Sequence, residues 1–125
     1  MKRVNTLVLL FFNLSFSLAQ QQMGITFQGV AYDAEQRQVT NRKISVRTSV
    51  IQDNQPIYVE THLTSTNNVG LFSLIIGNGV PSLGQYATIP WKAGSLRLRR
   101  EYDLEGGTNY IISGEDYFYA IPYAL

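Results

Sequence analysis

His62 is the only histidine in this chain of 125 residues, and histidine is the side chain best suited to acid–base chemistry near neutral pH. A Ser/His/Asp hydrolase needs its histidine within hydrogen-bond reach of a nucleophile and an orienting acid. His62 lies in the middle of an alternating run, and the sequence contains no Gly-x-Ser-x-Gly elbow. We therefore interpret His62 as a histidine on the surface of a strand, and we predict that the chain is not an enzyme.

Several acidic residues could form the carboxylate pair of a glycosidase or an oxygen site for Ca²⁺. They are Glu60, Glu101, Asp103, Glu105, Glu115 and Asp116. A small sandwich has little room for a deep cleft beside its core, and the ordered ligand spacing of a calcium loop is absent. The chain has no cysteine, which excludes thiolate metal sites and disulfides. We expect solvated carboxylates, no catalytic residue, no metal and no cofactor.

Trp91, Arg97 and Arg99 are candidates for an interaction surface. An exposed Trp91, with Tyr86, could form a platform for a sugar ring, although the large apolar area of a tryptophan favours a role in capping one end of the core. Arg97 and Arg99 share one face of a predicted strand and could meet an anionic glycan. A solvated strand face is the alternative for these two arginines.

Arg100 has the same phase as Leu96 and Leu98, which we expect to point inward. Burying an unpaired guanidinium is costly. The side chain of Arg100 should therefore reach a sheet edge or meet a carboxylate.

The C-terminal run is unusually apolar for a place where chains normally fray. Its candidate contact residues are Tyr117, Tyr119, Tyr123 and Leu125. One interpretation is a last core strand followed by a frayed tail. The other is docking onto a downstream domain or a sister chain. In the second case the chain should self-associate, and deletion of residues 121–125 should make it monomeric by sedimentation.

The first 19 residues have the order of a secretory signal peptide. Lys2 and Arg3 precede an apolar run at 7–12, and small residues, Ser17 and Ala19, occupy the −3 and −1 positions. The run is too short to span a bilayer. We predict cleavage after Ala19, which leaves one domain at 20–125, exported to the cell surface, the extracellular medium or the periplasm. The formal charge of +1 then becomes slightly negative, and nothing in it indicates nucleic acid as a partner.

The mature part has the period-two alternation of half-buried strands and no helical stripe. Turn clusters rich in Gly, Asn and Pro separate the strands, which we place at 24–32, 43–52, 57–66, 70–77, 95–103, 109–113 and 116–121. Short strands at this spacing predict an all-β fold, an antiparallel two-sheet sandwich of about seven strands, as in Ig-like domains. The expected core residues are Phe27, Val46, Val50, Leu71, Ile75, Leu96 and Leu98.

Six blocks of sequence occur in the order found in a known module. They are GITFQGVAYDA at 24–34, YVETH at 58–62, Asn67 with GLFSLIIG at 70–77, YATI at 86–89 with Trp91 and Gly94, GGTNY at 106–110, and IPYAL at 121–125. Together they resemble the N-terminal β-sandwich module of secreted and surface proteins of bacteroidete-type bacteria, which is similar to prealbumin-like sandwiches. The sequence departs from that family at Gln36 and Gln38, where Gly and Pro are usual, and at Arg100, where the family is apolar.

The resemblance implies a non-catalytic module that precedes collagen-like or tail-fibre-like segments. The expected function is therefore that of a structural or interaction module in a surface or secreted assembly, with a protein partner at the C-terminal edge. A glycan-binding sandwich is the alternative, and a small secreted hydrolase is a third. An exposed aromatic row beside Trp91 would favour the second, and a cleft that joins His62 to acids would favour the third.

Overall fold

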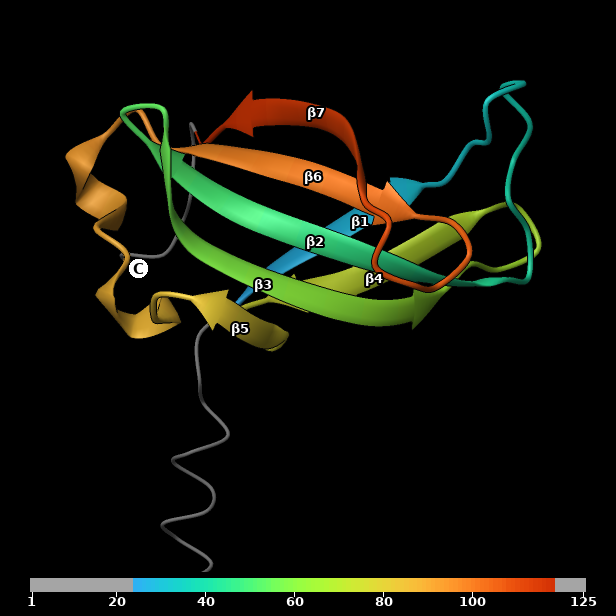
Figure 1. The fold of residues 1–125 in the computed structure, drawn as a ribbon, viewed down its shortest axis with the longest axis horizontal. Helices are drawn as coiled ribbons and strands as arrows, with labels where there is room; N and C mark the ends of the chain where they lie inside the picture. Colours follow the sequence, from blue (N-terminus) through green and yellow to red (C-terminus); the bar gives the residue numbers. More distant parts are fainter. Residues whose placement is uncertain (1–23, 119–125) are drawn as a thin grey trace, which may run out of the picture.

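The computed structural model describes residues 24–118, which form two antiparallel sheets packed as a sandwich (Figure 1). The larger sheet has the order β5-β3-β2-β6-β7, and the smaller one pairs β1 with β4. The strands are β1 (Ile25–Val30), β2 (Lys43–Gln52), β3 (Gln55–Ser65), β4 (Leu71–Ile76), β5 (Val80–Leu83), β6 (Arg97–Asp103) and β7 (Ile111–Tyr117). The predicted all-β two-sheet sandwich is confirmed. None of the short helical turns in this part of the chain is long or apolar enough to cross a membrane.

The core lies between the sheets in two adjoining clusters. One contains Ile44, Val46, Phe72, Leu74, Ile76 and Leu98, among others, and the second consists of Val50, Tyr58, Ile89 and Leu96. Of the residues expected in the core, Val46, Val50, Leu96 and Leu98 are buried, and Phe27 is half-buried against the first cluster. The alternation in β2 and β6 therefore predicted the inward face correctly.

The inward phase of β4 is the reverse of the expected one. Leu71 and Ile75, predicted to lie in the core, are exposed, whereas Phe72, Leu74 and Ile76 are buried. Five of the six residues in β4 are apolar, so both phases could cover a core. In the structure, the face of β4 that contains Ser73 is turned outward. This is favourable because burial of an unpaired hydroxyl would cost free energy.

The strands expected at 109–113 and 116–121 form one continuous element within the described residues, β7, which pairs with β6. Where we expected a loop around Pro81, the short strand β5 pairs with β3, and two 3-10 turns follow it, η1 (Tyr86–Thr88) and η2 (Trp91–Ala93). β5 is an edge strand, which is where a proline inside a sheet is tolerated.

The register of β7 changes where it opposes β6. Arg100 lies opposite Gly114, but Glu101 lies opposite Ile112, so Ser113 is an extra residue in β7. Such a β-bulge shifts the following side chains to the other face. It places Ile111 opposite Tyr102, whose ring packs on Phe72 with centroids 5.6 Å apart. Ile111 therefore lies on the same face of the larger sheet as Tyr102, where its side chain remains exposed.

The sandwich has two sides where the sheets meet edge to edge. On one side β3 continues through a turn into β4, and the side chain of Asn67 accepts the backbone N–H groups of Val69 and Leu71 in that turn. On the other side β1 passes behind β6, where the guanidinium of Arg100 lies 5.9 Å from the ring centroid of Phe27 (Figure 1). β7 is the outer strand of the larger sheet on this second side.

Candidate functional site

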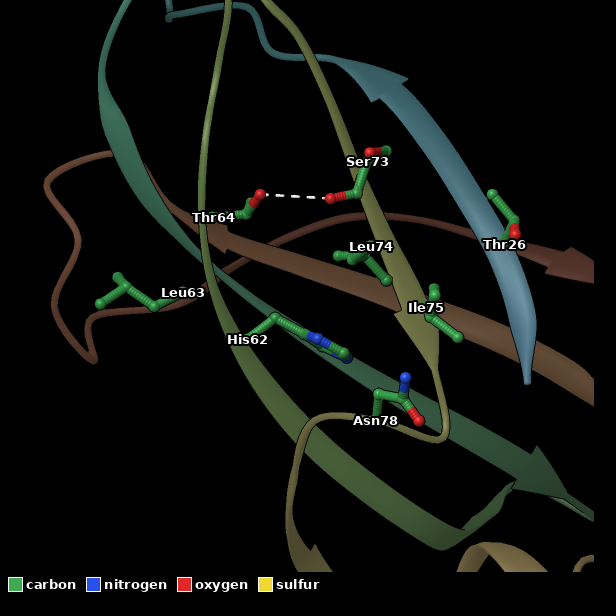
Figure 2. A pocket seen from close by; sticks show the side chains of 8 residues that line it. All are labelled: Thr26, His62, Leu63, Thr64, Ser73, Leu74, Ile75 and Asn78. Atoms are coloured by element: carbon green, nitrogen blue, oxygen red, sulfur yellow. Dashed lines mark hydrogen bonds between the residues drawn. The ribbon is translucent and has the colours of Figure 1, made fainter. Parts of the chain in front are cut away.

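A pocket of about 450 Å³ opens on the side where β3 meets β4 (Figure 2). We call it the His62 pocket. It is lined by Thr26, His62, Leu63, Thr64, Ser73, Leu74, Ile75 and Asn78. Polar groups from β1, β3, β4 and the following turn therefore surround a floor that is partly aliphatic.

His62 lies on the inward phase of β3, together with Tyr58, Glu60 and Thr64. Its side chain is 9% exposed, and its Nε2 atom lies 2.5 Å from Oε2 of Glu60, whose side chain is completely buried. Our interpretation of His62 as a surface histidine and of Glu60 as a solvated carboxylate was wrong. The polar phase of β3 points inward because the two side chains satisfy each other there.

Glu60 receives hydrogen bonds from three further groups. The Tyr58 hydroxyl donates to Oε1 at 2.6 Å, and the Gly77 N–H lies 3.0 and 2.9 Å from the two carboxylate oxygens. The Gly79 N–H donates to Oε1 at 3.3 Å. A buried carboxylate with this many donors is stabilised in its ionised form. Glu60 thus ties β3 to the turn that follows β4.

Two glycines allow the turn to approach Glu60 this closely. Gly77 has a φ of +110°, a conformation that side chains rarely adopt. A Cβ atom at Gly79 would lie 2.7 Å from both the His62 ring and the Thr61 carbonyl oxygen. The turn between β4 and β5 therefore requires glycine at both positions.

The ionisation of the cluster follows from these contacts. Burial by itself raises the pKa of Glu60, but the hydrogen bonds from His62, Tyr58 and the Gly77 N–H outweigh burial and hold this pKa below its ordinary value of 4.5. Burial, together with the hydrogen bond to Glu60, raises the pKa of the Tyr58 hydroxyl well above its usual range. The cluster therefore contains a carboxylate and a neutral phenol at neutral pH.

A histidine oriented by a carboxylate is two-thirds of a Ser/His/Asp system, and the third part is a hydroxyl beside the ring. Thr64 and Ser73 line the pocket, but the Thr64 hydroxyl donates to the Ser73 carbonyl oxygen at 3.2 Å. Figure 2 shows the Ser73 side chain at the opposite end of the pocket from the imidazole, with Asn78 nearer to the ring. The arrangement suits hydrogen bonding to a polar ligand better than nucleophilic attack.

Arg97 and Arg99 share the outer face of β6, as predicted, and both contact Glu115 of β7. Arg99 Nε lies 2.6 Å from Glu115 Oε2, and Arg97 Nε lies 3.2 Å from Oε1 without the alignment of a hydrogen bond. Arg97 also donates to the Asn54 side chain at 3.1 Å and stacks 5.9 Å from the ring centroid of Tyr117. These contacts therefore hold both guanidinium groups against the outer face of the larger sheet.

Arg47 and Glu101 form a second ion pair on the outer face, and the sequence analysis did not predict that these two residues would pair. Nε and Nη2 of Arg47 donate to the two carboxylate oxygens of Glu101, at 2.9 and 2.8 Å, and the guanidinium stacks 4.4 Å from the ring centroid of Tyr110. Glu101 is buried by these contacts, so the expectation of a solvated carboxylate was wrong there. Arg100 points inward and bonds to Asp116, which confirms that it would meet a carboxylate.

Asp103 is also buried, contrary to the expectation that it would be solvated. Its two carboxylate oxygens accept the N–H groups of Glu105 and Asn109, each at 2.9 Å. Asp103 thereby fixes the loop between β6 and β7. An Asp two residues before a backbone donor in a Gly-rich turn is the sequence signal for such a role.

Trp91 packs inside the end of the sandwich, edge-on to Tyr86 and Phe118 with centroids 5.8 and 5.2 Å apart. This packing supports the interpretation that Trp91 caps one end of the core. It does not fit the alternative, in which Trp91 would belong to an exposed row of aromatic rings that binds a glycan. Tyr117 is exposed on β7. The other predicted contact residues, Tyr119, Tyr123 and Leu125, lie outside the described residues.

A second hollow, of about 500 Å³, lies on the opposite side of the sandwich, where the end of β1 faces the start of β7. We call it the β1–β7 groove. Its lining residues include the exposed apolar side chains Val30, Tyr32 and Ile111. None of Trp91, Arg97, Arg99 and Tyr117, which were predicted as contact residues, lines this groove.

Among residues 24–118, no cluster of three or more His, Cys, Asp or Glu side chains is arranged to hold a metal ion. Comparisons of the chain with protein-family models, with curated proteins and with solved structures found no match.

Proposed function

We propose that this chain is a non-catalytic, exported structural or interaction module of a cell-surface or secreted assembly. The observation that carries the proposal is the β1–β7 groove. Ile111 is 69% exposed there, beside the exposed rings and methyl groups of Tyr32 and Val30. Contiguous apolar surface beside a free sheet edge is typical of sites that bind another protein.

The ionisable side chains give the proposal independent support. Glu60, Glu101 and Asp103 each accept hydrogen bonds at both carboxylate oxygens from donors of the same chain. Catalytic acids and bases need an unsatisfied position that faces the substrate. The bonds of these carboxylates instead connect strands and loops, as expected of a rigid module.

The test uses the whole chain, with residues 1–19, in cells that make it naturally. A photo-crosslinking amino acid replaces Ile111 in one variant and Val80 in a matched control, because both side chains are 69% exposed. We expect intact mass to show an exported protein that lacks residues 1–19, and crosslinks to protein from position 111 only. Retention of residues 1–19, or equal crosslinking at the two positions, would refute the proposal.

A second candidate, a glycan-binding sandwich, is favoured by the His62 pocket alone. Its imidazole, amide and hydroxyl groups over aliphatic side chains match the alternating polar and apolar surface of a sugar. If this function holds, Asn78→Ala should abolish binding to a glycan array without lowering thermal stability. Unchanged binding would reject the pocket as the site.

A further inference from the structure

The β1–β7 groove has one wall whose direction is set by the fold. The bulge at Ser113 turns Ile111 toward Tyr102, and both residues line the groove. β-bulges commonly re-aim side chains beside functional sites. The bulge therefore decides that Ile111 is the residue of β7 that lies opposite Tyr102 beside the groove.

The opposite wall comes from the chain just after β1. Tyr32 is exposed, and its backbone is held by an isolated bridge to Gln38. Ala31 donates its N–H to the Gly70 carbonyl at 2.9 Å. The aromatic ring is therefore presented from a fixed backbone, which suits it to stack against an aliphatic or cationic side chain.

The charged groups of the groove are all of one sign. The lining contains Asp33, Asp103 and Glu105 and no basic residue. Arg37 and Arg42 pair with two of these carboxylates, 3.1 Å from Asp33 and 3.6 Å from Glu105, so the three carboxylates of the lining outnumber the two arginines. Backbone N–H groups hold the pKa values of Asp33 and Asp103 below their ordinary value of 3.8. The lining therefore stays anionic at all physiological pH values.

Free backbone groups border the same groove. In the described residues β1 pairs only with β4, and β7 pairs only with β6. The facing edges of these strands leave N–H and C=O groups available to an added strand. An extended segment can therefore be recognised by its backbone, while its side chains meet the apolar walls and the carboxylates in alternation.

We propose that the β1–β7 groove binds an extended, basic segment of a partner protein, with aliphatic side chains against Ile111 and Tyr32 and a Lys or Arg side chain directed to Glu105 and Asp33. The proposal rests on the interaction role proposed above and names the chemistry of the partner. Electrostatic complementarity of this kind sets which segment is accepted and makes its binding sensitive to salt.

The probes are the capped hexapeptides KVKVKV and EVEVEV, titrated into the exported chain by NMR or calorimetry at low salt. We expect KVKVKV to bind and EVEVEV to show no binding. Ile111→Ser should weaken binding of KVKVKV by about fivefold or more, since about 1 kcal/mol of apolar contact is lost. Glu105→Gln should weaken it and reduce its salt dependence. Val80→Ser, equally exposed on β5, is the control and should bind as the unchanged chain does.

Three results would overturn the proposal. They are equal binding of the two peptides, equal effects of Ile111→Ser and Val80→Ser, and self-association through position 111 that excludes KVKVKV. In each case crosslinking at position 111 in cells would still report whether the module has an interaction role, so failure of the partner chemistry is distinguishable from failure of the proposed function.

Discussion

The two sides on which the sheets meet edge to edge are built in opposite ways. On the His62 side, the buried carboxylate of Glu60 collects donors from β3 and from the turn after β4, and the edge is closed by hydrogen bonds. On the other side, Val30, Tyr32 and Ile111 leave apolar surface in solvent, and within residues 24–118 β1 and β7 each pair with one strand only. Stability should therefore reside on the first side and recognition on the second.

The substitution with the largest expected effect is Glu60→Ala. It would leave the Gly77 and Gly79 N–H groups, the Tyr58 hydroxyl and His62 without their acceptor. Removal of one partner from a buried ionic cluster costs about 3–5 kcal/mol. Urea unfolding measures the loss, with the exposed Glu105→Ala as control. A loss below about 1 kcal/mol would show that the two sides are equally dispensable for stability.

The same carboxylate predicts a pH dependence. The folded-state pKa of Glu60 lies below the ordinary 4.5, so its contribution to stability is complete above pH 4.5 and is lost as the pH falls through the folded-state pKa. Acid unfolding of Glu60→Gln should therefore depend less on pH in that window than acid unfolding of the unchanged chain. Parallel acid-unfolding curves would contradict this assignment.

A substitution in the core between the two sides gives a reference value for the loss of stability. Leu98→Ala should cost about 2–5 kcal/mol, because it leaves a cavity in a packed core. Ile75→Ala should cost less than about 1.5 kcal/mol, since Ile75 is exposed on the outer phase of β4. Equal losses in denaturant titrations would mean that β4 has the register originally expected from the sequence.

His62→Ala should have a smaller effect, a loss of about 1–3 kcal/mol, because one donor to a buried acceptor disappears. It should leave any biological activity unchanged. Leu63→Ala, on the exposed phase of the same strand, is the control for stability. A hundredfold loss of a turnover rate with intact folding would instead identify His62 as an acid–base group.

The smallest expected effect on stability is at the β1–β7 groove. Ile111→Ser should change the free energy of unfolding by no more than about 0.5 kcal/mol, as surface substitutions usually do. Val80→Ser should behave in the same way. Thermal and urea unfolding of both variants measure this. A loss at Ile111 alone would mean that the side chain belongs to the core, and the contrast between the two sides would disappear.

The fold was predictable where polar and apolar residues alternate strictly. In β2 and β6 the phase with Val46, Val50 and Leu98 is the more apolar of the two, and those residues are buried. β4 is apolar on both phases, so only Ser73 could indicate the outward one. β5 contains Pro81, and local patterns do not reveal an edge strand of this kind.

The candidate site was much less predictable. The apolar phase of β3, with Ile57, Val59 and Leu63, is the one that patterning would bury, yet Glu60 and His62 point inward. Their burial depends on donors from Gly77 and Gly79, which are distant in the chain and come close only in the folded sandwich. The signal was present as glycines that follow an apolar strand, but its meaning depends on three-dimensional contacts.

The turn between β2 and β3 has a consequence for the order of folding. Asp53 and Asn54 both have positive φ, 52° and 65°, so they form the two-residue hairpin turn that matches the twist of adjoining strands. This hairpin can form locally within about 1–10 μs. By contrast, the two sheets are complete only after residues distant in sequence have paired, such as Phe27 with Leu74 and Thr48 with Arg100. We expect the β2–β3 hairpin to template the remaining strands, and the overall rate to be in the slow, millisecond-to-second range of sandwiches whose contacts are distant in sequence.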